Sequence, residues 1–126
     1  MKKNKEKILE RIKKDRGFVQ ESRKIWAEYN WKTLDLYHQM FMNVMNDQKK
    51  VDRKIKELII IAIDAANLYE IGLEVHFKSA LKMGITAEEI FEVLETASVV
   101  NGVHVLAVSL PILDRVLKGR GKIIKK

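Results

Sequence analysis

The sequence of 126 residues contains no cysteine, one proline and six glycines. Without cysteine, the chain can form no disulfide, no thiolate metal site and no thiol-based redox centre. Proline and glycine interrupt regular structure, so their scarcity favours helices over a turn-rich β fold. No apolar run approaches the roughly 20 residues that span a bilayer, and no apolar segment follows the N-terminal lysines as a secretory signal requires. We therefore expect a cytoplasmic, all-α protein without membrane association.

Basic residues are concentrated at the two ends of the chain. Residues 1–16 hold eight basic and three acidic side chains, and residues 118–126 hold five basic and no acidic ones. Because the whole chain has a formal charge of +7, residues 17–117 carry a net −3. Neither end contains an aromatic residue for base stacking, so we expect no specific nucleic-acid partner. A nucleic-acid role would instead predict DNA binding that weakens steeply with salt.

Apolar residues recur at three- and four-residue steps over most of the chain, which is typical of buried helix faces. Gly17 and Gly84 are expected to end helices. Thr86 and Glu89 have the spacing of a capping box, and Asp52 is expected to cap the following helix through its side chain. The pattern predicts a compact bundle of six or seven helices.

The sequence divides into three expected parts. These are a basic amphipathic helix over residues 1–17, a helical domain over residues 18–117 and a basic tail over residues 118–126. A break near Asn30 is expected to split the second helical segment, and Pro111 is expected to kink or restart the last one.

Two carboxylates lie on one face of the helix predicted after Asp52. Glu57 and Asp64 are seven residues apart, which is two helical turns. Asp64 lies within IIIAIDAA, where an unpartnered charge would cost several kcal/mol. It must therefore be paired, neutral, or directed at a cavity or subunit interface, and a buried network that fixes packing is one interpretation. For Glu57, the pattern alone favours a surface ion pair with Lys54 or Lys56.

The three histidines have different surroundings. His76 lies on the apolar side of its helix, where a core role and a catalytic role are both open. His104 follows the Asn101-Gly102 break near a helix start, and His38 lies among core aromatic residues, which favours a structural role. No two histidines have the three- or four-residue helical spacing of a metal pair, so we predict no metal site and no cofactor.

Three strings carry a family resemblance: VDRKIKELIIIAIDAA, EVHFKSALKMGITAEEIFEVLE and ASVVNGVHVLAVSLPIL. From Val51 to about Leu113, the chain resembles the carboxymuconolactone decarboxylase family, which includes alkyl hydroperoxidase D-like proteins. In the thiol-active branch, a glutamate precedes Cys-x-x-Cys and a histidine. This sequence keeps the spacing with Glu57 and His76 but has Tyr69 and Gly72 at the cysteine positions.

The resemblance implies the all-α alkyl hydroperoxidase D-like bundle without its thiol peroxidase chemistry. The sequence is similar to the decarboxylase branch, although His104 stands where that branch usually has proline. This implies a cofactor-independent lyase for a small carboxylated or lactone substrate, and a homotrimer or homohexamer. The implied catalytic residues are His76, as acid or electrostatic stabiliser, and Glu57, which must lie within reach to orient it. The substrate-pocket candidates are Tyr69, Gly72, Asp64 and His104. A non-catalytic small-molecule-binding or assembly relative is the alternative.

Overall fold

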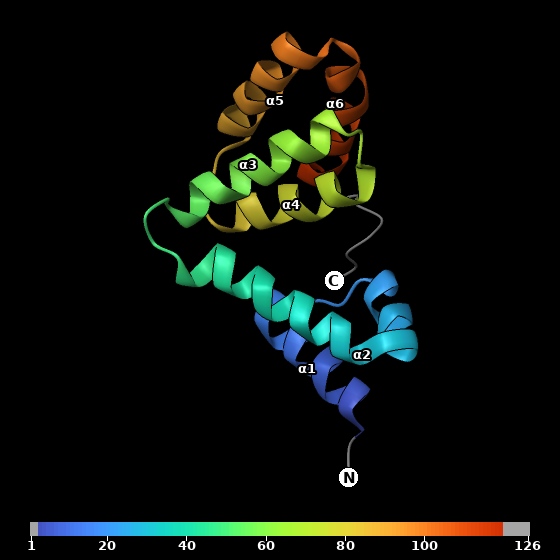
Figure 1. Cartoon of the computed structure of the whole chain (residues 1–126). Coiled ribbons are helices and arrows are strands. Elements are labelled where there is room, and N and C mark those ends of the chain that lie inside the picture. Colours follow the sequence, from blue (N-terminus) through green and yellow to red (C-terminus); the bar gives the residue numbers. More distant parts are fainter. Residues whose placement is uncertain (1–2, 120–126) are drawn as a thin grey trace. The chain divides into compact units, whose positions relative to one another are not determined.

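The computed structural model describes residues 3–119, and within that range every regular element is a helix. Residues 120–126 of the predicted basic tail therefore lie outside the described part. The chain divides into two compact units, Met1–Lys49 and Lys50–Lys126 (Figure 1). The all-α class and the expected number of helices are confirmed. No helix among residues 3–119 has the length and apolar content needed to cross a bilayer.

The first unit consists of α1 (Asn4–Arg16), α2 (Glu21–Met42) and the short π-helix η1 (Asn43–Asp47). The helix α1 ends at Gly17, as predicted, and packs against α2. The apolar stripe of α1 meets the apolar face of α2 in a small core made of Ile8, Ile12, Ala27 and Leu34.

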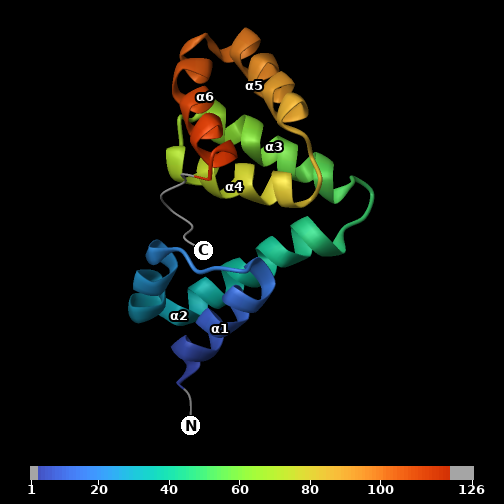
Figure 2. The ribbon, with the colours of Figure 1, turned by 180° about the vertical axis from the view of Figure 1, so that it is seen from behind.

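The helix α2 changes direction at Asn30, and Figure 2 shows the bend. Asn30 has φ −161° and ψ 76°, which is outside the helical region. Its side-chain Oδ1 accepts a hydrogen bond from the Thr33 backbone N–H at 3.1 Å. Asn30 therefore caps the second half of α2, as asparagine does at a helix start, and the expected break is confirmed.

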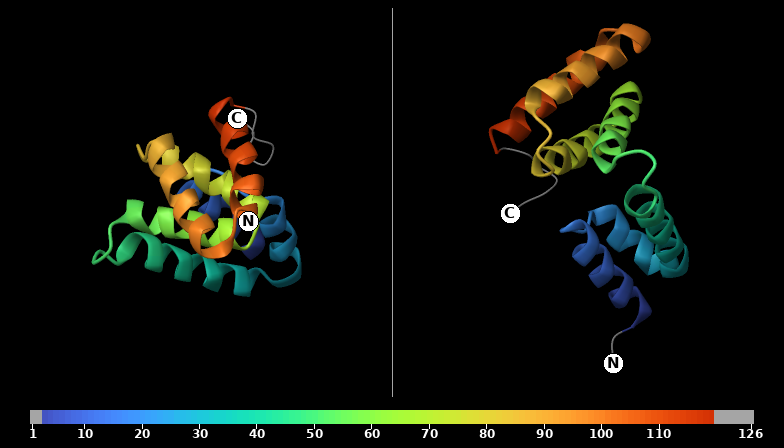
Figure 3. Two further views of the ribbon diagram at one scale, coloured as in Figure 1. Left: turned by 90° about the horizontal axis from the view of Figure 1, so that it is seen from above. Right: turned by 90° about the vertical axis from the view of Figure 1, so that its left-hand side faces the viewer.

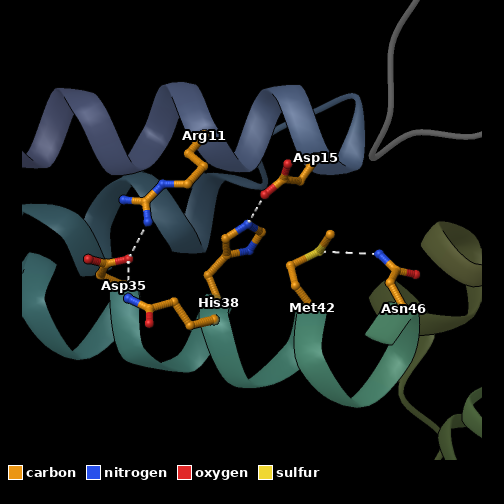
Figure 4. Close-up of polar contacts among 7 residues, drawn as sticks. Arg11, Asp15, Asp35, His38, Met42 and Asn46 are labelled. Atoms are coloured by element: carbon orange, nitrogen blue, oxygen red, sulfur yellow. Dashed lines mark hydrogen bonds and ion pairs between the residues drawn. The ribbon is translucent and has the colours of Figure 1, made fainter. Parts of the chain in front are cut away.

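Polar contacts join α1 to α2 along one side of the first unit (Figure 4). Arg11 donates to Asp35 at 2.8 Å, and Gln39 donates to the same oxygen at 3.1 Å. Burial acts to raise the pKa of Asp35, but the hydrogen bonds from Gln39 and Arg11, together with the nearby positive charge, outweigh it and lower the pKa. The buried His38 lies 2.8 Å from the Asp15 carboxylate, so this histidine belongs to the packing of the unit.

The second unit consists of α3 (Arg53–Ala66), α4 (Glu70–Lys82), α5 (Ala87–Asn101) and α6 (His104–Leu117). The pair α3 and α4 forms one layer and the pair α5 and α6 forms the other (Figure 3). Their apolar faces meet in a core of Ile61, Ala65, Leu73, Phe77, Ala80, Ile85, Ile90, Leu94, Val105, Ile112, Leu113 and Val116.

The turn between α4 and α5 contains the predicted helix-ending glycine and the predicted capping box. Gly84 adopts φ +90°, a left-handed conformation that favours glycine. The Ile85 N–H then reaches back to the Ala80 carbonyl at 3.0 Å and closes the end of α4. Thr86 and Glu89 form the expected capping box at the start of α5.

Two local expectations need correction. Asp52 occupies the N-cap position of α3, but its side chain makes no capping hydrogen bond. The helix α6 continues through Pro111 without restarting, although the proline nitrogen has no N–H to donate within the helix. The helix α3 also has an exposed apolar face, on which Ile55, Ile59 and Ile63 are each about half exposed.

We expect Thr86→Ala to lower the free energy of unfolding by about 1 kcal/mol, because the Glu89 N–H loses its acceptor. The matched control is Thr96→Ala in the same helix, where the threonine hydroxyl only donates to the Glu92 carbonyl. Urea denaturation followed by circular dichroism measures both variants. Equal effects of the two substitutions would contradict the stabilising role of the capping box.

Candidate functional site

The predicted site residues lie where α3 packs against α4. Glu57 and Asp64 are two turns apart on α3, and Gly72 and His76 are one turn apart on α4. Glu57 shares its face with the buried Ile61, so both carboxylates project from the packed side of α3. The two helices thus bring together residues that are up to 19 positions apart in the sequence.

Glu57 and His76 are in direct contact. One Glu57 oxygen, Oε2, lies 2.5 Å from His76 Nδ1, and the other, Oε1, accepts a hydrogen bond from Arg53 Nη1 at 2.7 Å. Glu57 is 0% exposed, so neither oxygen relies on solvent. The contact that the sequence hypothesis requires is therefore present.

The charge of Glu57 is stabilised by these two neighbours. Burial alone would raise the pKa of this carboxyl, because a charged group loses hydration. The hydrogen bond and positive charge of His76, followed by those of Arg53, outweigh burial and lower the Glu57 pKa. Glu57 is therefore a carboxylate at neutral pH, and it accepts the proton on His76 Nδ1.

The other ring nitrogen of His76 is available for chemistry. Because the Glu57 carboxylate can only accept, Nδ1 donates to it and the tautomer is fixed. Within residues 3–119, no hydrogen bond engages Nε2. The His76 side chain is 12% exposed, whereas Glu57 is fully covered. This arrangement presents an oriented imidazole, supported from behind by a buried carboxylate.

Asp64 lies at the other end of the same helix pair, against the first turn of α4. A Cβ atom added to Gly72 would lie 2.8 Å from Asp64 Cγ and 2.5 Å from Tyr69 Cδ2, distances that real Cβ atoms do not show. The Asp64 carboxyl and the Tyr69 ring therefore fill the space where a side chain at position 72 would project. Only glycine fits beside them without a shift.

The pKa of Asp64 is shifted in the opposite direction to that of Glu57. Burial is the largest cause and raises the Asp64 pKa. The positive charge of His76 acts to lower it, and the negative charge of Glu57 raises it further. Asp64 thus keeps its proton to higher pH than an ordinary aspartate.

His104 is apart from these residues. It begins α6, is exposed, and its ring lies over Gly102, where a Cβ atom would come within 2.7 Å of the imidazole. Among the described residues, no hydrogen bond or ion pair joins it to Glu57, His76 or Asp64. The structure therefore brings five of the six predicted site residues to the interface of α3 and α4 but not His104.

The structure also corrects the interpretation of Glu57 as a surface residue paired with Lys54 or Lys56. Its partner on α3 is Arg53, which the sequence reasoning missed. The available signal was spacing, because Arg53 lies one turn before Glu57 and shares its face. Over residues 3–119, no group of three or more histidine, aspartate or glutamate side chains is arranged as a metal site.

Comparison with known proteins places the chain. The profile of the carboxymuconolactone decarboxylase family matches residues 32–115. The chain belongs to this family. The matched range contains both α3 and α4, and with them the contact between Glu57 and His76.

Two known proteins are similar to parts or all of the chain. The uncharacterized protein MJ0742 of Methanocaldococcus jannaschii is 37% identical over 68 residues, which cover 53% of this chain and 65% of that protein. A Burkholderia xenovorans LB400 protein, described as a "putative carboxymuconolactone decarboxylase", has a similar crystal structure. The TM-score is 0.76 with 22% identity over 94% of this chain and 97% of the other. This second likeness concerns the fold.

The steric relation between Asp64 and position 72 can be tested by substitution. Alanine normally stabilises a helix relative to glycine by about 0.5–1 kcal/mol, but Gly72→Ala should destabilise the protein by about 1–3 kcal/mol because the new methyl meets the Asp64 carboxyl. The same substitution in an Asp64→Ala background should cost at most half as much. Urea denaturation of the four proteins in the cycle measures the difference, and an equal cost in both backgrounds would contradict the clash.

Proposed function

We propose that this protein is a cofactor-independent lyase that removes carbon dioxide from a small carboxylated lactone. The observation that carries the proposal is the buried contact between Glu57 and His76, which presents His76 Nε2 as an oriented proton donor. Membership of the carboxymuconolactone decarboxylase family supports the same substrate class. The absence of cysteine from the sequence leaves no residue for the thiol chemistry of the family's other branch.

The proposed reaction breaks the bond between the substrate carbon and its carboxylate. The electron pair stays on the substrate and is delocalised as an enolate-like anion, while carbon dioxide leaves. Protonated His76 stabilises this negative charge and then transfers its Nε2 proton to the substrate carbon. The neutral imidazole keeps the proton on Nδ1, which remains hydrogen-bonded to Glu57, and Nε2 regains a proton from solvent.

Arg53 has a positioning role in this scheme. It holds Oε1 of Glu57, so that Oε2 remains directed at His76. Without this second partner, the Glu57 carboxylate could rotate and break its hydrogen bond to the His76 imidazole. His76 is thus the proposed catalytic residue, Glu57 orients His76, and Arg53 orients Glu57.

A second candidate function is a non-catalytic small-molecule-binding relative. The observation that favours it is the filling of the space beside Gly72 by the Asp64 carboxyl and the Tyr69 ring, which narrows the room for a substrate. The two candidate functions differ in whether substrate is converted, because a binding protein would release its ligand unchanged.

The first experiment is decarboxylation of 4-carboxymuconolactone by the purified protein. We expect turnover, and we expect His76→Ala to reduce kcat by about 10²–10⁴-fold because the proton donor is lost. Glu57→Gln should reduce kcat as well, since it removes the charge that stabilises protonated His76. The matched control is His38→Gln, which alters another histidine–carboxylate pair, in the first unit. Ligand binding without turnover would favour the second candidate, and equal activity in His76→Ala would overturn the proposed role of that residue.

We also propose that the chain assembles with itself as a homotrimer or homohexamer. Supporting this are Ile55, Ile59 and Ile63, which form a stripe along α3 and are each about half exposed. Multi-angle light scattering should give three or six times the chain mass of 14.7 kDa. Ile59→Lys should shift the population towards monomer, and a wild-type monomer would contradict the proposal.

A further inference from the structure

The site extends along α4 from His76 to Gly72, which lies one helical turn away. Gly72 and His76 are four residues apart on α4, which corresponds to about 6 Å along the helix axis. The Asp64 carboxyl lies over Gly72, whereas the Glu57 carboxylate contacts His76. The two carboxyl groups of α3 are therefore spaced along the same face of α4, with the imidazole beside one and the side-chain-free glycine beside the other.

The two carboxyl groups differ in how their oxygens are used. Both oxygens of Glu57 are engaged, one by Arg53 and the other by His76. Among residues 3–119, the Asp64 carboxyl takes part in no hydrogen bond, and its charged neighbours are His76 from α4 and Glu57 from its own helix. Its hydrogen-bonding capacity therefore remains available to a ligand.

The neighbouring charges and burial determine whether the Asp64 carboxyl is protonated when a ligand binds. Burial raises the Asp64 pKa and the nearby Glu57 charge raises it further, against the attraction of His76. An anionic ligand would add a further negative charge beside this group. Both effects favour the protonated carboxyl, which can donate a hydrogen bond.

We propose that Asp64 is a second substrate-contacting residue, whose protonated carboxyl donates a hydrogen bond to an oxygen of an anionic lactone carboxylate. The inference rests on the proposed function, since it places the substrate across Asp64 and His76. Binding takes up one proton when Asp64 is ionised beforehand. Asp64 thereby makes the site selective for anions that present an acceptor oxygen about one helical turn from the reacting carbon.

The test uses 5-oxotetrahydrofuran-3-carboxylate, a saturated lactone carboxylate that has no conjugated system to take up the electron pair of decarboxylation. Isothermal titration calorimetry gives its Kd from about pH 5 to about pH 8, where the probe is ionised. The proteins compared are the wild type, Asp64→Asn, Asp64→Ala and the control Asp114→Asn, which alters an exposed aspartate on α6. All four retain His76, so differences between their pH profiles report on position 64.

The proposal predicts a distinctive order of affinities. Wild-type binding should weaken by up to tenfold per pH unit above the Asp64 pKa, in addition to any dependence shared by all variants. Asp64→Asn keeps a donor that does not ionise, so it should match the wild type below the Asp64 pKa and bind more tightly than the wild type above it. Asp64→Ala should bind about 10- to 100-fold more weakly at acidic pH because the donor is lost. The control should follow the wild type.

Each contrary result has a separate meaning. Identical pH profiles for the wild type and Asp64→Asn, or a lack of binding at every pH, would overturn the role of Asp64. Binding with the predicted profile but no turnover of 4-carboxymuconolactone would overturn the lyase and leave the Asp64 inference standing. Turnover together with unchanged profiles would do the reverse.

Discussion

A fully buried carboxylate on α3 constrains how the second unit is built. Removing a charge from water costs several kcal/mol unless its oxygens find donors, and Glu57 is 0% exposed. Its two donors come from different helices, Arg53 from α3 and His76 from α4. Satisfying this one group therefore fixes the separation of α3 and α4, the rotamer of Arg53 and the tautomer of His76 together. The core residues around it pack against an arrangement that the ion pairs already specify.

The same helix face holds a second carboxyl with the opposite behaviour. Glu57 and Asp64 share desolvation as the leading influence on their pKa values, yet the Glu57 pKa is lowered and the Asp64 pKa is raised. The difference lies in donors, since Glu57 receives hydrogen bonds from Arg53 and His76 and Asp64 receives none among the described residues. Two carboxyl groups whose pKa values are driven apart are suited to different tasks in one site. Here one carboxylate orients an imidazole, and the other keeps its hydrogen-bonding capacity.

Local signals in the sequence were sufficient for most of the fold. Gly84, Asn30 and the pair of Thr86 and Glu89 act within a few residues of themselves, so their structural consequences could be predicted. The partner of Glu57 could not be predicted from charge proximity, because Arg53 and Lys54 both lie about one turn before Glu57 on α3. The structure shows that Arg53 makes the contact, whereas the Lys54 ammonium lies beside the turn at Gly84. The family spacing suggested His76, while the packed register of Glu57 with Ile61 explains why the contact forms. The clash between Asp64 and any side chain at position 72 depends on how two helices approach, and no sequence pattern reports that.

The relation between Asp64 and Gly72 also bears on how a thiol site and this site exclude each other. The resemblance places a cysteine of the thiol-active branch at position 72, where the Asp64 carboxyl now fills the space for a Cβ atom. A thiol at position 72 and the Asp64 carboxyl cannot occupy that space together, so a side chain at position 72 requires the carboxyl to move. In this chain the Asp64 carboxyl lies against α4 at position 72, one turn from His76, so the chemistry that this site can offer is hydrogen-bond donation and proton transfer rather than thiol chemistry.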